Sequence, residues 1–298
     1  MSARPEGTVA AAGPHPIVAT LSMIRFAHTV FALPFALLSA LLAAGGIPPL
    51  PVLLWILVAM VGARSAAMSF NRIVDRDVDA KNPRTVSREL PAGVLSVRFT
   101  ALFCAVSAAL FVLAAAELNR LCLLLSPVAL AIVLGYSLTK RFTVLSHLVL
   151  GISLAIAPVG AWIAVTGTLS LLPVALALAV VFWVAGFDVI YSLQDEAFDK
   201  AQGLKSIPAR LGNRRALLVS AFFHAAALAL LFAAFLLSKG GLLFGFGVVL
   251  SGVFLVRQHA ILKPGDLSRI DAAFFTANGW LSIVLFACGA ADVFLRGR

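Results

Sequence analysis

The segment "NRIVDRDVDAKNPRT" (Asn71–Thr85) is dense in charge, yet it follows directly on the apolar run "LLWILVAMVGARSAAMSF". The chain has 298 residues, of which 61% are hydrophobic and 12% are charged, and its mean hydropathy is +1.03. Apolar residues run almost continuously in blocks that are separated by short loops. This pattern predicts an all-α polytopic membrane protein, because a helix satisfies its own backbone hydrogen bonds in lipid.

Nine apolar blocks are candidate membrane spans. We expect them to form a single membrane-embedded domain over residues 1–298, with a flexible N-terminus over 1–20. The N-terminus lacks the charged segment and cleavage site of a signal peptide. The predicted spans lie near 22–45, 50–71, 98–117, 119–138, 145–166, 169–191, 215–237, 240–257 and 274–295.

The net charge of +10 could suggest a nucleic-acid partner, but its distribution favours a membrane protein with no such partner. With the N-terminus in the cytosol, nine spans place all but five of the 23 Lys and Arg residues on the cytosolic side. This bias is typical of inner (plasma) membrane proteins and predicts the orientation. Basic cytosolic loops also suit an anionic substrate. The three cysteines show no metal spacing, and we interpret them as small apolar residues.

Two acidic motifs occur at matching places, each after an apolar block. Asp75 and Asp79 map onto Asp195 and Asp199 by adding 120, and each pair precedes a basic segment that contains a proline. On a regular helix, Asn71, Asp75 and Asp79 share one face, whereas Asp77 points away. The same geometry places Asp188, Asp195 and Asp199 close together in direction. Each motif therefore directs several oxygen ligands into one region.

Facing carboxylates repel one another, so a cation must compensate them. Mg²⁺ is suited to this, since one or two carboxylates and substrate phosphates commonly hold it. Nearby basic residues then become candidate ligands of a diphosphate. The chain contains no glycine loop of the nucleotide-binding type, so a lipid diphosphate is the more natural substrate. The basic candidates are Arg72, Arg84, Lys140, Arg141, Lys205 and Arg210.

These motifs resemble those of the UbiA superfamily of intramembrane prenyltransferases. "NRIVDRDVD" is similar to the first aspartate-rich motif of that family, and "DVIYSLQDEAFD" is similar to its second. "YSLTKRFT" and "GLKSIPARLG" resemble two of its basic segments. Further segments are similar to 4-hydroxybenzoate polyprenyltransferases and to a bacterial subgroup of the futalosine pathway to menaquinone. One departure is Arg72, where many members carry aspartate.

The resemblance implies a mechanism in which two Mg²⁺ ions bridge the diphosphate of a polyprenyl donor. Asp75 and Asp79, assisted by Asn71, would hold one ion. Asp195 and Asp199 would hold the other. The basic residues Arg72, Lys140, Arg141 and Lys205 would bind the diphosphate. An allylic cation would then attack an aromatic acceptor, such as 4-hydroxybenzoate, on the way to ubiquinone or menaquinone.

Other residues are candidates for acceptor binding. Arg64 lies within a predicted span, where a charge is costly and indicates function. Arg64 could bind an aromatic carboxylate or pair with a structural acid. Arg25 could reach the same cavity or anchor the first helix, and we also assign Tyr136 and Tyr191 to the acceptor. Asp188 could orient or deprotonate the acceptor phenol, or instead bond Tyr191 or a basic neighbour.

Rival functions remain at this point. A cation-coupled transporter could use the carboxylates, although transporter sites usually lie near the bilayer midplane in broken helices. A CDP-alcohol phosphatidyltransferase would carry a D-G-x-x-A-R element that this chain lacks. A scaffold would not need two acidic clusters. Among prenyltransferases, a hydroxynaphthoate acceptor is the main alternative to 4-hydroxybenzoate, and the length of the isoprenoid chain stays open.

Overall fold

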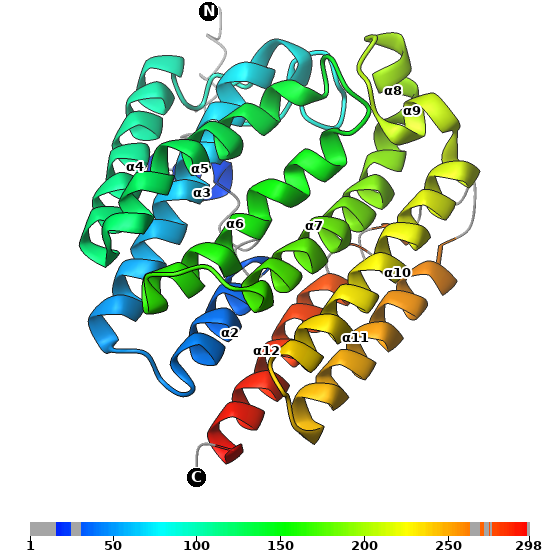
Figure 1. Ribbon diagram of the computed structural model, residues 1–298. Helices are drawn as coiled ribbons and strands as arrows, with labels where there is room; N and C mark the ends of the chain where they lie inside the picture. The colour runs from blue at the N-terminus through cyan, green and yellow to red at the C-terminus, as the bar shows by residue number, and fades with distance from the viewer. Residues whose placement is uncertain (1–15, 25–30, 263–268, 271–273, 275, 297–298) are drawn as a thin grey trace, which may run out of the picture.

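The computed structural model describes residues 16–24, 31–262, 269–270, 274 and 276–296, and these contain helices and no strand (Figure 1). This confirms the prediction of an all-α protein. The α-helices are α1 (Pro16–Met23), α2 (Leu33–Ala44), α3 (Leu50–Asp79), α4 (Val97–Leu118), α5 (Arg120–Thr139), α6 (Ser146–Thr166), α7 (Leu171–Ser192), α8 (Glu196–Ala201), α9 (Ile207–Leu211), α10 (Asn213–Leu237), α11 (Leu242–Ala260) and α12 (Ala277–Arg296).

Eight helical segments within the described ranges are long and apolar enough to cross a membrane. The shorter apolar helix α2 occupies the place of the first predicted span, 22–45, of which residues 25–30 lie outside the described part. The prediction of about nine membrane helices is therefore confirmed. Where a predicted span and a helix correspond, most ends agree within three residues because the apolar blocks have clear polar borders.

Local signals explain several helix ends. The Ser96 hydroxyl accepts a hydrogen bond from Phe99 N at 3.1 Å and caps α4, and the Asn119 side chain accepts one from Cys122 N at 2.9 Å and caps α5. Gly167 ends α6 with φ of 70°, a left-handed conformation that glycine adopts without steric cost. Asn119 thus joins α4 directly to α5, and Gly167 begins the short connection from α6 to α7.

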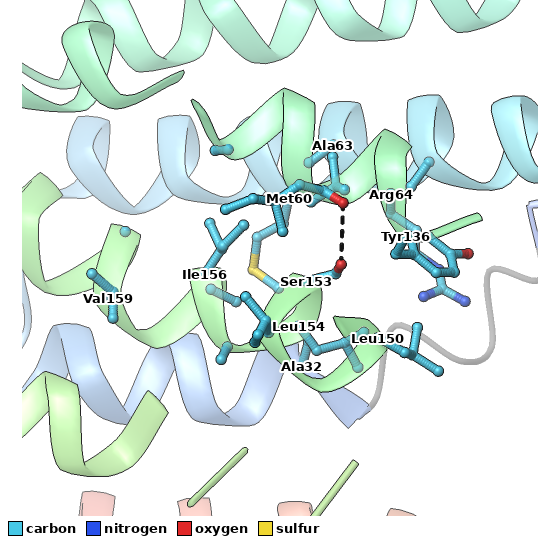
Figure 2. Close-up of a pocket in the computed structure, with 18 of the residues that line it drawn as sticks. Ala32, Met60, Ala63, Arg64, Tyr136, Leu150, Ser153, Leu154, Ile156 and Val159 are labelled. Atoms are coloured by element: carbon cyan, nitrogen blue, oxygen red, sulfur yellow. Dashed lines mark hydrogen bonds between the residues drawn. The ribbon is translucent and has the colours of Figure 1, made fainter. Parts of the chain in front are cut away.

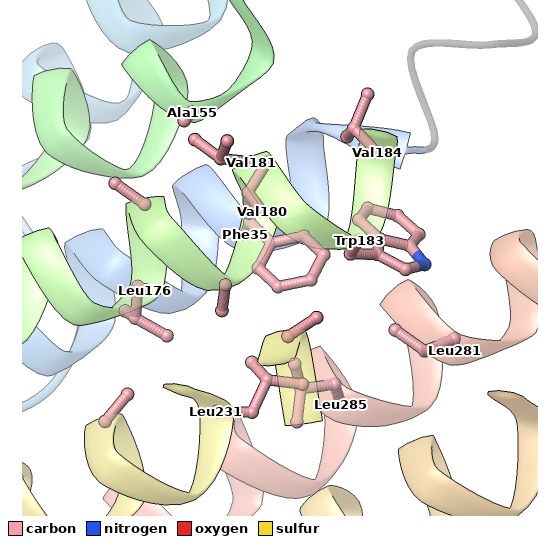
Figure 3. Packing of buried hydrophobic residues seen from close by; sticks show 14 of the residues in the cluster. Phe35, Ala155, Leu176, Val180, Val181, Trp183, Val184, Leu231, Leu281 and Leu285 are labelled. Carbon is pink, nitrogen blue, oxygen red and sulfur yellow. The ribbon is translucent and has the colours of Figure 1, made fainter. Parts of the chain in front are cut away.

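Helix α7 is the most enclosed membrane helix among the described segments, because 72% of its most apolar 18-residue stretch is buried. Its side chains pack against α2, α6 and α10, and the cluster includes Phe35, Leu176, Trp183, Leu231 and Leu285 (Figure 3). The indole N–H of Trp183 donates to Asn278 Oδ1 on α12 at 2.8 Å, which satisfies the one polar group of that ring. The carboxyl end of α7, which carries Asp188 and leads into the rest of the second acidic motif, is thus held by a packed core.

The two acidic motifs differ in local structure. Helix α3 continues past its predicted end at residue 71 and carries the first motif in regular helical geometry to Asp79. The second motif is not on one regular helix, so the predicted grouping of Asp188 with Asp195 and Asp199 on one helical face was wrong. Helix α7 ends at Ser192, a 3₁₀ turn spans Leu193–Asp195, and α8 carries Asp199. Helices α8 and α9 lie at the same end of the bundle as the segment after α3 (Figure 1).

Candidate active site

The first acidic motif lines one face of the last turns of α3. Asn71 Nδ2 donates to Asp75 Oδ2 at 2.8 Å, one helical turn apart. Asp79 is 5% exposed, and both of its oxygens accept from Arg88 Nη1, at 2.7 and 2.8 Å. Asp77 points away, as predicted: its side chain is 82% exposed and pairs only locally with Arg76.

The second acidic motif is buried and is paired with residues distant in sequence. Asp195 Oδ1 accepts from Arg84 Nε at 3.0 Å and from Asn82 Nδ2 at 3.2 Å. Arg84 Nη2 also donates to Asp195 Oδ2, so the guanidinium grips the carboxylate by two nitrogens. Asp199 is 1% exposed and lies 2.8 Å from Lys140 Nζ.

Two connections join the motifs. Lys140 pairs with Asp199 of the second motif, and its neighbour Arg141 donates from Nη2 to Asp75 Oδ1 of the first at 3.1 Å. Arg84, in the loop after the first motif, reaches across to Asp195. Residues 120 positions apart in the sequence therefore belong to one network of charges. We name the four motif carboxylates and their four basic partners the charge network: Asp75, Asp79, Asp195, Asp199, Arg84, Arg88, Lys140 and Arg141.

The charge network keeps Arg84 in its protonated, positively charged form. Burial works against its positive charge, but the hydrogen bonds and negative charge of Asp195 outweigh burial and raise the pKa of Arg84 above its ordinary value. The hydroxyl of Tyr191 accepts a further bond from Arg84 Nη1 at 3.0 Å. Arg84 is thus a permanent cation that bridges a motif carboxylate and a residue of the neighbouring cavity.

The network suits a magnesium ion that is shared with a diphosphate. Its acidic members and Asn71 offer oxygen donors, which Mg²⁺ prefers. Neither oxygen of the buried Asp199 carboxylate has a hydrogen-bond partner among the described residues. The contact with Lys140 is therefore an ion pair whose angles do not suit a hydrogen bond. Within the same residues, no three acidic, His or Cys side chains lie close enough to hold an ion alone. The donors fit Mg²⁺ when phosphate oxygens complete its coordination.

A cavity of about 680 Å³ adjoins the network and is lined mainly by residues of α3 to α7. Asn71, Arg72, Arg88, Asp188 and Tyr191 line its polar part. Figure 2 shows Arg64 and Tyr136 together at one end, with apolar side chains such as Val159 toward the other. The hydroxyl of Ser153, which also lines the cavity, bonds to backbone carbonyls, to Val149 O at 3.0 Å and to Ile132 O at 3.4 Å (Figure 2).

The cavity also reaches the outer surface of the helical bundle. Three apolar residues that line it are partly exposed: Val128 on α5 by 56%, Ile152 on α6 by 42% and Leu178 on α7 by 43%. In a membrane protein this surface faces lipid. The cavity therefore combines a cationic and polar end with an apolar part that a hydrocarbon chain could enter from the side.

The remaining predicted residues have varied surroundings. Arg72 is 3% exposed, lies at 3.9 Å from Glu89 and lines the cavity, in agreement with a position near the network. Lys205 lies beside Lys140 through a backbone hydrogen bond, and its Nζ donates to Phe142 O. Arg210 is exposed on α9. Arg25 lies outside the described residues.

Three residues of the site were not identified from the sequence. Arg88 and Asn82 lie in the segment after the first motif, and the density of basic and amide residues there was the available signal. His147 is the third, and its Nδ1 lies 2.6 Å from Asp188 Oδ2. No spacing in the sequence relates these two residues, which are 41 positions apart.

Comparisons with known proteins agree with this geometry. Residues 32–282 match the model of the UbiA prenyltransferase family. The chain is 32% identical over 258 residues to the 4-hydroxybenzoate octaprenyltransferase of Nitrosomonas europaea, which covers 86% of this chain and 87% of that protein. A protein of the same name from Francisella tularensis subsp. novicida is 29% identical over 252 residues, or 84% and 87% of the two chains.

Solved structures show the same arrangement of helices. A UbiA homolog from Aeropyrum pernix K1 superposes with a TM-score of 0.82 and 38% identity, over 89% of this chain and 98% of that one. A UbiA homolog from Archaeoglobus fulgidus, bound to DMAPP and Mg²⁺, superposes with a TM-score of 0.73. That protein is 23% identical, and the match covers 93% of this chain and 99% of the other, so this likeness concerns the fold.

Proposed function

Because this chain belongs to the UbiA prenyltransferase family, we propose that it transfers a polyprenyl group from polyprenyl diphosphate to an aromatic acid, with 4-hydroxybenzoate as the acceptor. The product would be a precursor of ubiquinone or menaquinone. The names of the curated relatives support this acceptor. A hydroxynaphthoate is the alternative acceptor, since it presents a comparable carboxylate and phenol.

The observation that carries the proposal is the charge network beside a cavity open to lipid. A polyprenyl diphosphate has an anionic head and a long hydrocarbon tail, and this site offers basic residues and a lateral apolar opening. Its head would meet Lys140 and Arg141, with Arg72 and Lys205 nearby. Its tail would lie among the apolar side chains of α5 to α7. A soluble substrate would need no such opening.

Magnesium would be held with the diphosphate by the carboxylates of both motifs. Asn71, Asp75 and Asp79 are the proposed ligands on the α3 side, and Asp195 and Asp199 are those of the second motif, with one ion for each. When bound, Mg²⁺ supplies positive charge that stabilises the departing diphosphate. The A. fulgidus homolog, bound to DMAPP and Mg²⁺, supports the choice of ion.

The residues of the chain then have separate tasks. The basic members of the network bind phosphate oxygens as the carbon–oxygen bond of the donor breaks. The apolar walls keep water from the allylic cation while the acceptor ring forms its new carbon–carbon bond. Arg64 binds the acceptor carboxylate, and Tyr136 and Tyr191 flank its ring. Asp188 takes up the phenolic proton of the acceptor.

The setting of the enzyme follows from its helices. The protein is a multi-pass membrane protein, and we place it in the inner (plasma) membrane as one domain, with its N-terminus and the network on the cytosolic side. A cation-coupled transporter is the distant alternative. A transporter would release no diphosphate from a prenyl donor, so release that depends on Mg²⁺ separates the two functions.

The test uses purified protein in detergent with geranyl diphosphate, Mg²⁺ and a panel of aromatic acids, and mass spectrometry identifies the products. Prenylated 4-hydroxybenzoate is expected. Asp75→Ala and Asp195→Ala should each abolish its formation. Asp77→Ala is the matched control in the same motif, because its exposed side chain points away from the network. Full activity of Asp75→Ala or Asp195→Ala would overturn the assignment.

A further inference from the structure

His147 connects three elements of the site. It is the second residue of α6 and is 2% exposed. Its Nδ1 lies 2.6 Å from Asp188 Oδ2 on α7, and its Nε2 accepts a hydrogen bond from the backbone N–H of Ile207, at the start of α9, at 3.3 Å. The imidazole thus lies between a carboxylate of the cavity wall and the backbone of the basic segment that follows the second motif.

These two contacts determine the tautomer of His147. A backbone N–H can only donate, so Nε2 must be an acceptor and carries no proton. The single ring proton is then on Nδ1 and is donated to Asp188 Oδ2. His147 is therefore a neutral donor with a fixed orientation.

We infer that His147 is the positioning residue for Asp188 in acceptor activation, an inference that rests on the proposed prenyl transfer. The hydrogen bond from Nδ1 occupies Oδ2 and fixes the carboxylate, which leaves Oδ1 to accept the phenolic proton of the aromatic acid. That proton moves from the phenol oxygen to Oδ1, and the electron pair it leaves behind enriches the ring carbon that attacks the donor carbon, while the diphosphate departs with the electrons of the broken carbon–oxygen bond. The attacked ring carbon then loses its hydrogen as a proton to the leaving diphosphate, which restores the aromatic ring, and the phenol oxygen takes its proton back from Oδ1. His147 does not pass the proton on, because the Ile207 N–H occupies Nε2.

A pair of substitutions at residue 147 tests the role. In His147→Asn, the amide Nδ2 replaces Nδ1–H as a donor to Asp188, whereas His147→Leu has no donor. We expect His147→Leu to lower kcat by about 10- to 100-fold, the effect of losing one hydrogen bond to a charged group. KM for geranyl diphosphate should stay unchanged, and His147→Asn should recover most of the loss. Equal activity of the Leu and Asn variants, high or low, would overturn the inference.

A second pair of substitutions, at residue 207, tests the hydrogen bond to the other ring nitrogen of His147, Nε2. Ile207 is the first residue of α9, a position at which proline fits a helix. Ile207→Pro removes the N–H that orients His147, and Ile207→Ala removes a comparable part of the side chain but keeps the N–H. The proline variant should have a several-fold lower kcat than the alanine variant, and equal values would contradict the tautomer argument.

These results are distinct from a failure of the proposed function. If the wild-type protein prenylates no aromatic acid, or if Asp75→Ala remains active, the proposed function is wrong. If the wild type is active and Asp75→Ala is inactive, but His147→Leu retains full kcat, then the function stands and the role of His147 is refuted.

Discussion

Replacing Arg84 by alanine should destabilise the protein in the absence of Mg²⁺. Arg84 grips Asp195 by two nitrogens, and the side chains are 29% and 11% exposed, respectively. Removing one partner of a fully buried ion pair costs about 3–5 kcal/mol, whereas an exposed pair is worth about 0–1 kcal/mol. The partial exposure of Arg84 places the expected loss between these limits, at about 2 kcal/mol of unfolding free energy.

Magnesium should restore part of this loss in the variant. Without Arg84, the Asp195 carboxylate keeps the hydrogen bond from Asn82 but loses its nearest cation. A divalent ion can then take the vacant place. An ion at 100 times its dissociation constant stabilises the folded state by about 2.7 kcal/mol if it does not bind the unfolded chain. The wild type should gain less, because Arg84 competes for the same oxygens.

The measurement is the free energy of unfolding in detergent, from denaturant titrations with and without Mg²⁺. Arg76→Ala is the control, since Arg76 also pairs with an aspartate but is 48% exposed and outside the network. It should change stability by at most about 0.5 kcal/mol under either condition. Arg84 does not neutralise Asp195 in this way if Arg84→Ala is as stable as the wild type without Mg²⁺, or if Mg²⁺ stabilises both proteins equally.

Three further predictions concern the cavity, the packing and the metal. Arg64→Gln should raise KM for 4-hydroxybenzoate by about 10- to 100-fold, the effect of losing a hydrogen bond between two charges, with KM for the donor unchanged in steady-state assays. Gly151→Ala should lower the unfolding free energy by about 1–3 kcal/mol, because the new Cβ would lie 2.3 Å from Val181 O. Gly160→Ala on the same helix is the control and should not be destabilising, because no atom lies within 4 Å of the position of its Cβ. Chelation by EDTA should abolish prenyl transfer and added Mg²⁺ should restore it, with the circular dichroism spectrum unchanged throughout; activity that survives EDTA would contradict a metal role.

The sequence was sufficient for the helices and for the common face of Asn71, Asp75 and Asp79, because both depend on local patterns. Apolar blocks define α4 to α7, and the regular spacing in the first motif requires only that α3 continue to Asp79. The pairing of acids with bases could not be predicted, since Arg84 and Asp195 are 111 positions apart and meet through the fold. The contact of His147 with Asp188 has the same origin. The 3₁₀ turn over Leu193–Asp195 has no signal comparable to a proline or glycine.

The pairing pattern also bears on how magnesium and diphosphate would bind. Each motif carboxylate has one Lys or Arg partner, so the eight side chains of the charge network sum to zero charge. Two Mg²⁺ ions alone would add four positive charges to a partly buried site. The ions would repel each other and the four basic side chains, at a cost of about several kcal/mol. A diphosphate with about three negative charges would offset most of that excess and offer the oxygens that the carboxylates do not supply. We therefore expect Mg²⁺ to bind the wild type weakly alone and at least about tenfold more tightly with inorganic diphosphate, a difference of about 1.4 kcal/mol that calorimetric titration resolves. Equal affinity under the two conditions would mean that the carboxylates hold the ion without the substrate. It would also contradict the expectation that Arg84 competes with Mg²⁺ for Asp195.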